Sequence, residues 1–149
     1  MSLEQKIMAE LKTAMLSKDE KSVRSLRAIK AAIINAKTSE GAGGQVTEED
    51  ENKLLQKMVK QRNDSLEIFI QQNREDLAEK EREELQVIKK FLPRQLTTDQ
   101  LKEKIQKIIH ETGASTPADF GKVMGTASKQ LAGQADGKTI STIVKELLS

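Results

Sequence analysis

The chain has 149 residues, and its 25 Lys and Arg against 23 Asp and Glu give a formal net charge of +2. This length accommodates one domain or two small ones, and the near balance of charge argues against nucleic-acid binding by bulk charge alone. Cysteine is absent and histidine occurs once, which excludes disulfides, thiolate nucleophiles, thiolate-bound metals and paired-histidine metal sites. With no Trp, no Tyr and three Phe, a base-stacking surface is nearly excluded.

The sequence contains no recognisable membrane or export signal. No apolar run approaches the roughly 20 residues that span a bilayer, and the N-terminal stretch MSLEQKIMAE carries charges where a secretory signal is apolar. We therefore expect a protein that does not contact membranes and is cytoplasmic. Basic and acidic residues number eight and five in residues 1–40, nine and twelve in 41–92, and eight and six in 93–149, so the last third is mildly basic.

Apolar residues recur at helical spacing along the first ninety residues. They predict helices from Leu3 to about Met15, from about Asp19 to Lys37, after the N-cap Thr47 to about residue 70, and from about residue 75 to 92. Met15, Ile34 and Ile70 are placed on the inner faces. The glycine-rich stretch around Gly41–Gly44 predicts a mobile loop, and the run EKEREE (79–84) predicts a solvated helix face.

Pro93 disfavours helix for the residue before it and marks a domain boundary. Thr97 then opens a fifth helix that ends at Gly113, Thr116-Pro117 opens a sixth that ends at Gly133, and Asp136 caps a seventh. The sequence therefore predicts an all-α fold without strands: an N-terminal helical bundle (residues 1–93) followed by a small three-helix C-terminal domain (residues 94–149).

Candidate catalytic groups do not converge in the sequence. The acidic run Glu48–Glu51 and the pairs at 75/76 and 83/84 consist of adjacent residues, which point about 100° apart on a helix and do not meet on one ion. His110 falls in the last turn of a predicted helix, where it complements the helix C-terminus. No nucleophile lies beside a base, and no phosphate-binding loop is present. We predict no catalytic residue, no metal and no cofactor.

The segment Asp119-Phe120-Gly121-Lys122-Val123-Met124-Gly125 is unusual for a helix. Each glycine inside a helix costs about 1 kcal/mol relative to alanine, and Gly121 and Gly125 share one face. Two interpretations stay open: a notch for close packing of another helix, or a surface that an RNA backbone approaches closely. The surrounding lysines, which suit phosphate contacts, are Lys122, Lys129, Lys138 and Lys145.

At these residues the sequence resembles the GatB/YqeY family, whose motif also occurs in the C-terminal tail of the B subunit of glutamyl/aspartyl-tRNA amidotransferase. The blocks that carry the resemblance are Asp119 to Gly125, Gly133-x-Ala135-Asp136-Gly137 and Val144-Lys145. Further blocks resemble the stand-alone YqeY proteins: Lys60-Gln61-Arg62-x-Asp64-Ser65, Arg74-x-Asp76-Leu77-Ala78-x-Lys80-Glu81 and Phe91-Leu92-Pro93-x-Gln95-Leu96. Before Gly133, the stretch Gln130-Leu131-Ala132 departs from the family pattern and leaves Lys129 as the basic position there.

The resemblance implies an all-helical protein with an N-terminal bundle and a three-helix C-terminal domain. In the amidotransferase the related tail engages tRNA, while ammonia release and transamidation belong to parts that this sequence lacks. Three functions stay open: a non-catalytic module that binds tRNA or another RNA; a component of an amide-transfer system, related to carbon–nitrogen ligases that use glutamine; or a protein-interaction scaffold without nucleic acid.

Overall fold

The computed structural model describes residues 2–39 and 43–149. Within these residues it contains seven α-helices, one 3-10 helix and no strand, which confirms the all-α prediction. The elements in chain order are α1 (Leu3–Leu16), α2 (Glu20–Thr38), α3 (Glu48–Gln71), α4 (Glu75–Lys89), α5 (Thr98–Thr112), η1 (Pro117–Asp119), α6 (Phe120–Gln130) and α7 (Gly137–Leu148).

Side-chain caps set several of the helix boundaries. Ser2, Thr47 and Thr97 each accept the backbone N–H of the third residue of the following helix, and the side chain at that third position bonds back to the cap. These capping boxes satisfy two backbone donors that a helix start otherwise leaves unpaired. At the end of α5, Gly113 has a φ of +69°, the left-handed conformation that glycine adopts without steric cost.

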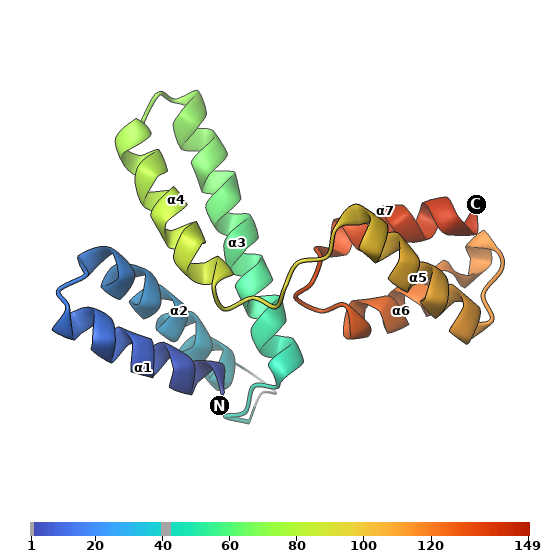
Figure 1. The fold of residues 1–149 in the computed structure, drawn as a ribbon, viewed down its shortest axis with the longest axis horizontal. Coiled ribbons are helices and arrows are strands. Elements are labelled where there is room, and N and C mark those ends of the chain that lie inside the picture. The colour runs from blue at the N-terminus through green and yellow to red at the C-terminus, as the bar shows by residue number, and fades with distance from the viewer. Residues whose placement is uncertain (1, 40–42) are drawn as a thin grey trace. The chain divides into compact units, whose positions relative to one another are not determined.

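The structure divides the chain into two compact units, residues 1–92 and 93–149. In the first unit, α1 pairs with α2 and α3 pairs with α4 as two helical hairpins, and α2 also packs against α4. Figure 1 shows the two hairpins set at an angle to each other, with the α1–α2 turn at the left of the view and the α3–α4 turn at the top. The core lies between the hairpins and draws on all four helices through Ile7, Leu26, Ile29, Leu55 and Ile88, all buried.

In the second unit, α6 packs against α7 and both contact α5. The apolar faces of the three helices form one core, whose buried residues are Leu101, Ile105, Ile108, Val123, Ala127, Leu131, Ile140, Ile143, Val144 and Leu148. A unit of this size is near the lower limit at which one apolar core supports a domain. Nearly every turn of these helices therefore contributes to the core.

Some local predictions for the first unit are wrong. Met15, Ile34 and Ile70 are exposed and not part of the core. Ile34 directly follows buried Ile33, and since neighbours on a helix point about 100° apart, only one of the two reaches the core. The predicted loop at Gly41–Gly44 falls partly outside the described residues.

The EKEREE run of α4, predicted to be solvated, is partly internal. Glu84 is buried between Arg24 of α2, at 3.4 Å, and Arg62 of α3, at 2.7 Å. Arg62 also lies 3.4 Å from Glu81, and Arg24 lies 2.9 Å from Glu83. These ion pairs connect three helices, so the carboxylates of this run face neighbouring cations. Among the described residues, no helix is both long enough and apolar enough to cross a bilayer.

Candidate functional site

Asp119, the residue immediately before α6, caps the turn that leads into this helix. Asp119 accepts the backbone N–H of Ser115 at 2.9 Å and of Thr116 at 3.2 Å. These two hydrogen bonds, with smaller help from the Thr116 hydroxyl and the nearby Lys122 ammonium, hold the pKa of Asp119 below its ordinary value of 3.8. The first residue of the family motif therefore has a structural role.

This depressed pKa predicts an acid-dependent loss of stability. A carboxyl group whose pKa is lower in the folded than in the unfolded chain stabilises the fold above its unfolded pKa, and that contribution is lost as the pH falls through its folded pKa. We expect Asp119→Asn to be less stable than the wild type at about pH 6 and to approach it at about pH 3. Thermal unfolding followed by circular dichroism measures this. A stability difference that stays constant between the two pH values would contradict a contribution from the charge.

The two faces of α6 differ sharply. Val123 and Ala127 are buried in the core of the unit. Lys122, Gly125 and Lys129 have the spacing i, i+3 and i+7, which places them on one helix face, and all three are exposed. Gly121, also exposed, lies one turn before Gly125. The structure therefore brings both candidate glycines and two of the four candidate lysines to one outward surface, hereafter the α6 face.

The packing interpretation of the two glycines is wrong. A Cβ atom added at Gly121 or at Gly125 would meet nothing within 4 Å. No neighbouring helix therefore uses their small size within the described residues. The glycines leave bare helix backbone in contact with solvent, with Gly125 between Lys122 and Lys129 along the helix and Gly121 just before Lys122.

Because the space beside these glycines is open, alanine should fit without a clash. We expect Gly121→Ala and Gly125→Ala each to raise the free energy of unfolding by about 1 kcal/mol, since alanine restricts the unfolded backbone and favours helix. Chemical denaturation of each variant, compared with the wild type, measures the gain. A loss of stability at either position would mean that the backbone there needs glycine for the fold itself.

The remaining two candidate lysines lie at opposite ends of α7. The Lys145 ammonium lies 5.6 Å from the centre of the Phe120 ring, a cation–π distance, so this lysine sits at the same end of α6 as Gly121. Lys138 instead lines a groove of about 320 Å³ between α5 and α7, together with Lys102 and Glu146. Lys145 therefore lies beside the start of α6 above a ring that packs against the core, whereas Lys138 borders a separate groove.

The beginning of α7 is capped by a carboxylate, as the sequence predicts. The Asp136 carboxylate already accepts the N–H of Thr139 at 2.6 Å. An incoming phosphate would meet this carboxylate at the helix N-terminus, and like charges repel. Any anion contact near Lys138 therefore depends on its side chain and not on the helix terminus.

The cations of the second unit form no ion pair among the described residues. Every ion pair there joins two residues of the first unit. The eight lysines and arginines of residues 93–149 therefore have no described carboxylate within 4.0 Å. Four of them were not among the candidates chosen from the sequence: Arg94, Lys102, Lys104 and Lys107. Lys104 and Lys107 could have been chosen from the helical spacing, because they do not fall on the buried positions of α5. Together with Arg94 they line a groove of about 610 Å³.

Other motif residues hold the second unit together. The side-chain N–H of Gln95 donates to the carbonyl of Gly133 at 2.6 Å, and the backbone N–H of Leu96 donates to the carbonyl of Gln134 at 3.0 Å. Gly133 has a φ of +81°, which favours glycine. The motif blocks around residues 95–96 and 133–134, far apart in the sequence, are thus joined by hydrogen bonds.

Of the carboxylates and the histidine that were considered as reactive groups, most cap helices or form ion pairs. Asp50 belongs to the capping box of α3, and the 83/84 pair contacts arginines of α2 and α3. His110 is exposed in the last turn of α5. Among residues 2–39 and 43–149, no three His, Asp or Glu side chains gather closely enough to hold a metal.

Comparison with known proteins identifies the relatives of this fold. Residues 4–148, nearly the whole chain, match the family described as Yqey-like protein. The chain belongs to the Yqey-like family. This assignment confirms the resemblance seen in the sequence blocks, and the structure assigns several of those blocks to capping and connections within each unit.

Yqey-like relatives of this chain include several fungal proteins named "Altered inheritance of mitochondria protein 41, mitochondrial". The chain is 36% identical to one from Clavispora lusitaniae over 127 residues, covering 84% of this chain and 71% of the relative. It is 32% identical to one from Pyrenophora tritici-repentis over 145 residues (96% and 79%), and 28% identical to one from Saccharomyces cerevisiae over 138 residues (91% and 71%).

These names contradict the cytoplasmic location expected from the sequence. The relatives are named as mitochondrial proteins. The expectation rested on charges near the N-terminus and on composition. Both properties indicate only that the surface of the helices is polar. Neither property distinguishes one aqueous compartment from another, so the prediction was wrong.

Proposed function

We propose that this Yqey-like protein is a non-catalytic RNA-binding module that contacts the phosphate backbone of tRNA or a similar RNA through its second unit. The α6 face, with Lys122, Lys129, Gly121 and Gly125, is the central contact. Lys145, beside the start of α6, and Lys138, in a separate groove, would add further phosphate contacts.

The observation that carries the proposal is the exposed pair of glycines on α6. Two glycines in a helix lower its stability by about 2 kcal/mol relative to alanine, and the open space around them removes packing as the reason for their presence. Bare backbone beside the two lysines lets a bulky ligand approach the helix closely. An RNA backbone is such a ligand, and its phosphates would lie between the two ammonium groups.

The surrounding charge agrees with this ligand. Among the described residues, the lysines of the second unit have no carboxylate partner, so binding a phosphate would not require such an ion pair to break. The second unit contains Phe120 and no other Phe, Tyr or Trp, and that ring lies beneath Lys145. Contacts should therefore be made to phosphates and carry little base specificity.

The resemblance to the amidotransferase tail supports RNA as the ligand and leaves a role in amide transfer as the competing function. We expect the purified chain neither to hydrolyse glutamine nor to amidate charged tRNA, because its residues assemble no activated nucleophile. An amidation assay with misacylated tRNA, glutamine and ATP tests this expectation. Glutaminase activity that a point substitution in this chain abolishes would replace the proposal with the amide-transfer function.

A bulky side chain on the α6 face should separate binding from folding. We expect Gly125→Leu to weaken tRNA binding by more than any single lysine substitution, because leucine would hold the RNA backbone away from the helix. Its fold should be retained, since the position faces open space. The matched control is Gln130→Leu, which adds similar bulk to an exposed residue of α6 roughly 140° around the helix. Equal losses of tRNA affinity in both variants, measured by filter binding, would argue against this face.

A further inference from the structure

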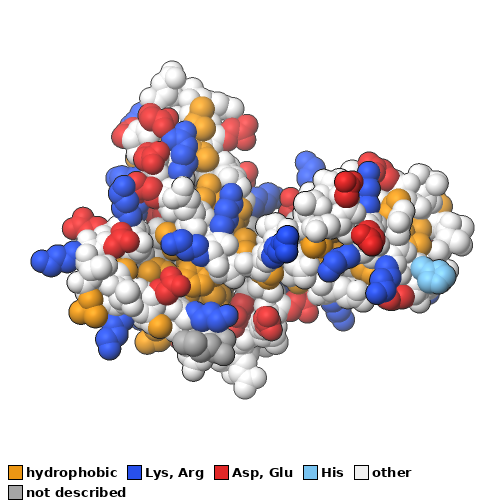
Figure 2. Space-filling view, viewed as in Figure 1, with side chains coloured by type: hydrophobic (Ala, Val, Ile, Leu, Met, Phe, Trp, Pro, Cys, Tyr) orange, Lys and Arg blue, Asp and Glu red, His pale blue; other side chains and the backbone are white. Residues whose placement is uncertain are grey.

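The α1–α2 hairpin carries an apolar surface that the first unit leaves uncovered. Met8, Met15 and Leu16 of α1 are 50%, 52% and 77% exposed, and Ile34 of α2 is 44% exposed. Figure 2 shows hydrophobic side chains gathered over α1 and α2, with lysines and arginines around them. Single exposed apolar residues are ordinary, but a gathered patch with a polar rim is typical of an interaction site.

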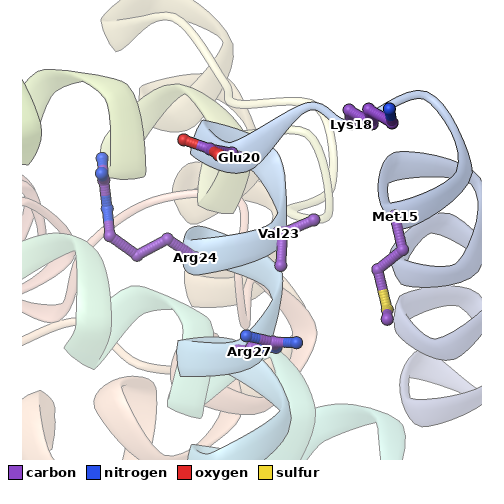
Figure 3. Close-up of a pocket in the computed structure, with 6 residues that line it drawn as sticks. All are labelled: Met15, Lys18, Glu20, Val23, Arg24 and Arg27. Carbon is purple, nitrogen blue, oxygen red and sulfur yellow. The ribbon is translucent and has the colours of Figure 1, made fainter.

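A groove between the end of α1 and the start of α2 forms part of this surface. Its volume is about 510 Å³. Figure 3 shows Met15 on α1 facing Val23 and Arg27 on α2 across the space between the helices, with Lys18 on the connecting turn. Arg24 also lines the groove but points away from α1, consistent with its ion pairs to two α4 carboxylates. The groove thus has an apolar floor at two helices and cations at its rim.

The rim cations have no partner that would neutralise them. Neither Lys18 nor Arg27 has a carboxylate within 4.0 Å among the described residues, and Glu20 is the one carboxylate that lines the groove. Lys18 also has a φ of +59°, in the left-handed region where glycine is favoured over lysine. The turn therefore holds a cation at a position where the backbone alone would favour glycine.

From these features we infer that the groove binds the apolar face of an acidic amphipathic helix belonging to a partner protein. Two adjacent helices form a furrow into which the ridge of a third helix packs. Acidic residues beside the apolar stripe of that helix would face Lys18 and Arg27. This inference concerns the first unit and does not depend on RNA binding by the second.

Other occupants fit the groove less well. A lipid surface is flat and would leave a concave furrow unfilled. A second copy that docks by the same groove about a two-fold axis would bring Lys18 and Arg27 close to their own counterparts, and like charges repel. An RNA strand would gain little from an apolar floor without aromatic rings. Charge and shape together therefore favour the acidic helix.

The probe for this inference is a fluorescently labelled synthetic peptide of about 18 residues, with leucines at i, i+3, i+4 and i+7 spacing and glutamates beside them. Two control peptides have the same composition in scrambled order, or lysine in place of every glutamate. Fluorescence anisotropy with the full chain should detect binding of the acidic striped peptide alone. Binding that does not distinguish the three peptides would overturn the inference.

Substitutions in the chain locate the site. We expect Met15→Ser to weaken peptide binding about tenfold, while Ile68→Ser, at a residue of α3 that is 50% exposed, leaves it unchanged. Lys18→Gly should weaken binding and make it less sensitive to salt, while raising the thermal stability of the chain, because glycine relieves the left-handed strain at this turn. A gain of stability with unchanged peptide affinity would remove Lys18 from the site.

The competing occupants are tested with the same variants. Vesicles containing phosphatidylserine and sedimentation of the chain at rising concentration are compared for wild type and Met15→Ser. Vesicle binding or self-association that Met15→Ser abolishes, in a chain that ignores the acidic peptide, would overturn the inference in favour of a membrane or a second copy. Peptide binding without either supports it.

Discussion

Replacing Lys122, Lys129 and Lys145 together by alanine is expected to lower the affinity for tRNA by on the order of 100-fold at about 0.1 M salt. Each lysine that neutralises a phosphate releases condensed counterions when the RNA binds. For each lysine removed, the slope of log affinity against log salt should therefore become less negative by about 0.7–0.9. The three side chains are exposed and make no ion pair in the part of the chain that the structure describes, so the variant should keep its fold. Filter binding at several salt concentrations measures both effects.

A second triple variant controls for net charge. Lys6, Lys57 and Lys60 are exposed in the first unit, and their replacement by alanine removes the same charge away from the α6 face. We expect this control to bind tRNA nearly as the wild type does. If both variants lose affinity equally, binding reflects overall charge and the α6 face is not the site.

Replacing Arg62 by alanine should cause the largest loss of stability, lowering the free energy of unfolding by about 2–4 kcal/mol. Arg62 of α3 lies 2.7 Å from the buried Glu84 of α4, and its removal would leave that carboxylate short of a partner inside the first unit. Arg24 would remain at 3.4 Å from Glu84 and would reduce the loss. Chemical denaturation of the full chain measures it.

Two further variants test the cause of this loss. The exposed pair between Arg74 and Asp76 provides the control, and Arg74→Ala should change stability little because water screens exposed ion pairs. The double variant Arg62→Leu/Glu84→Leu should recover much of the loss, since it leaves no buried charge unpaired. A double variant as unstable as Arg62→Ala would mean that lost packing, and not an unpaired carboxylate, is responsible.

The helices could be predicted from the sequence because local signals determine them. Apolar spacing, capping residues such as Thr47 and Thr97, and Gly113 after α5 are properties of a few neighbouring residues. The α4 helix was predicted to reach residue 92 but ends at Lys89. The backbone N–H groups of residues 90–92 donate to carbonyls three residues back instead of four, so tight turns replace the last turn of the α-helix before Pro93. The internal position of Glu84 was not predictable, because it depends on arginines 22 and 60 residues away in the chain.

The candidate site could be predicted only in part. Helical spacing puts Lys122 and Lys129 on one face, but the sequence could not decide whether Gly121 and Gly125 pack against a helix or face solvent. That choice depends on how α6 lies on α5 and α7. The groove beside Lys138 likewise depends on how α5 and α7 pack, whereas the cap at Asp136 is a local contact that the sequence predicted.

The measurement that most directly tests RNA binding by the second unit is the salt dependence of tRNA binding to the wild-type chain, by filter binding between about 0.05 and 0.2 M salt. Three or four phosphate contacts predict a slope of log affinity against log salt of about −2 to −4. The Gly125→Leu variant should bind far more weakly over the same range while remaining folded. The absence of binding, or binding of equal strength at both salt concentrations, would contradict a phosphate-binding α6 face.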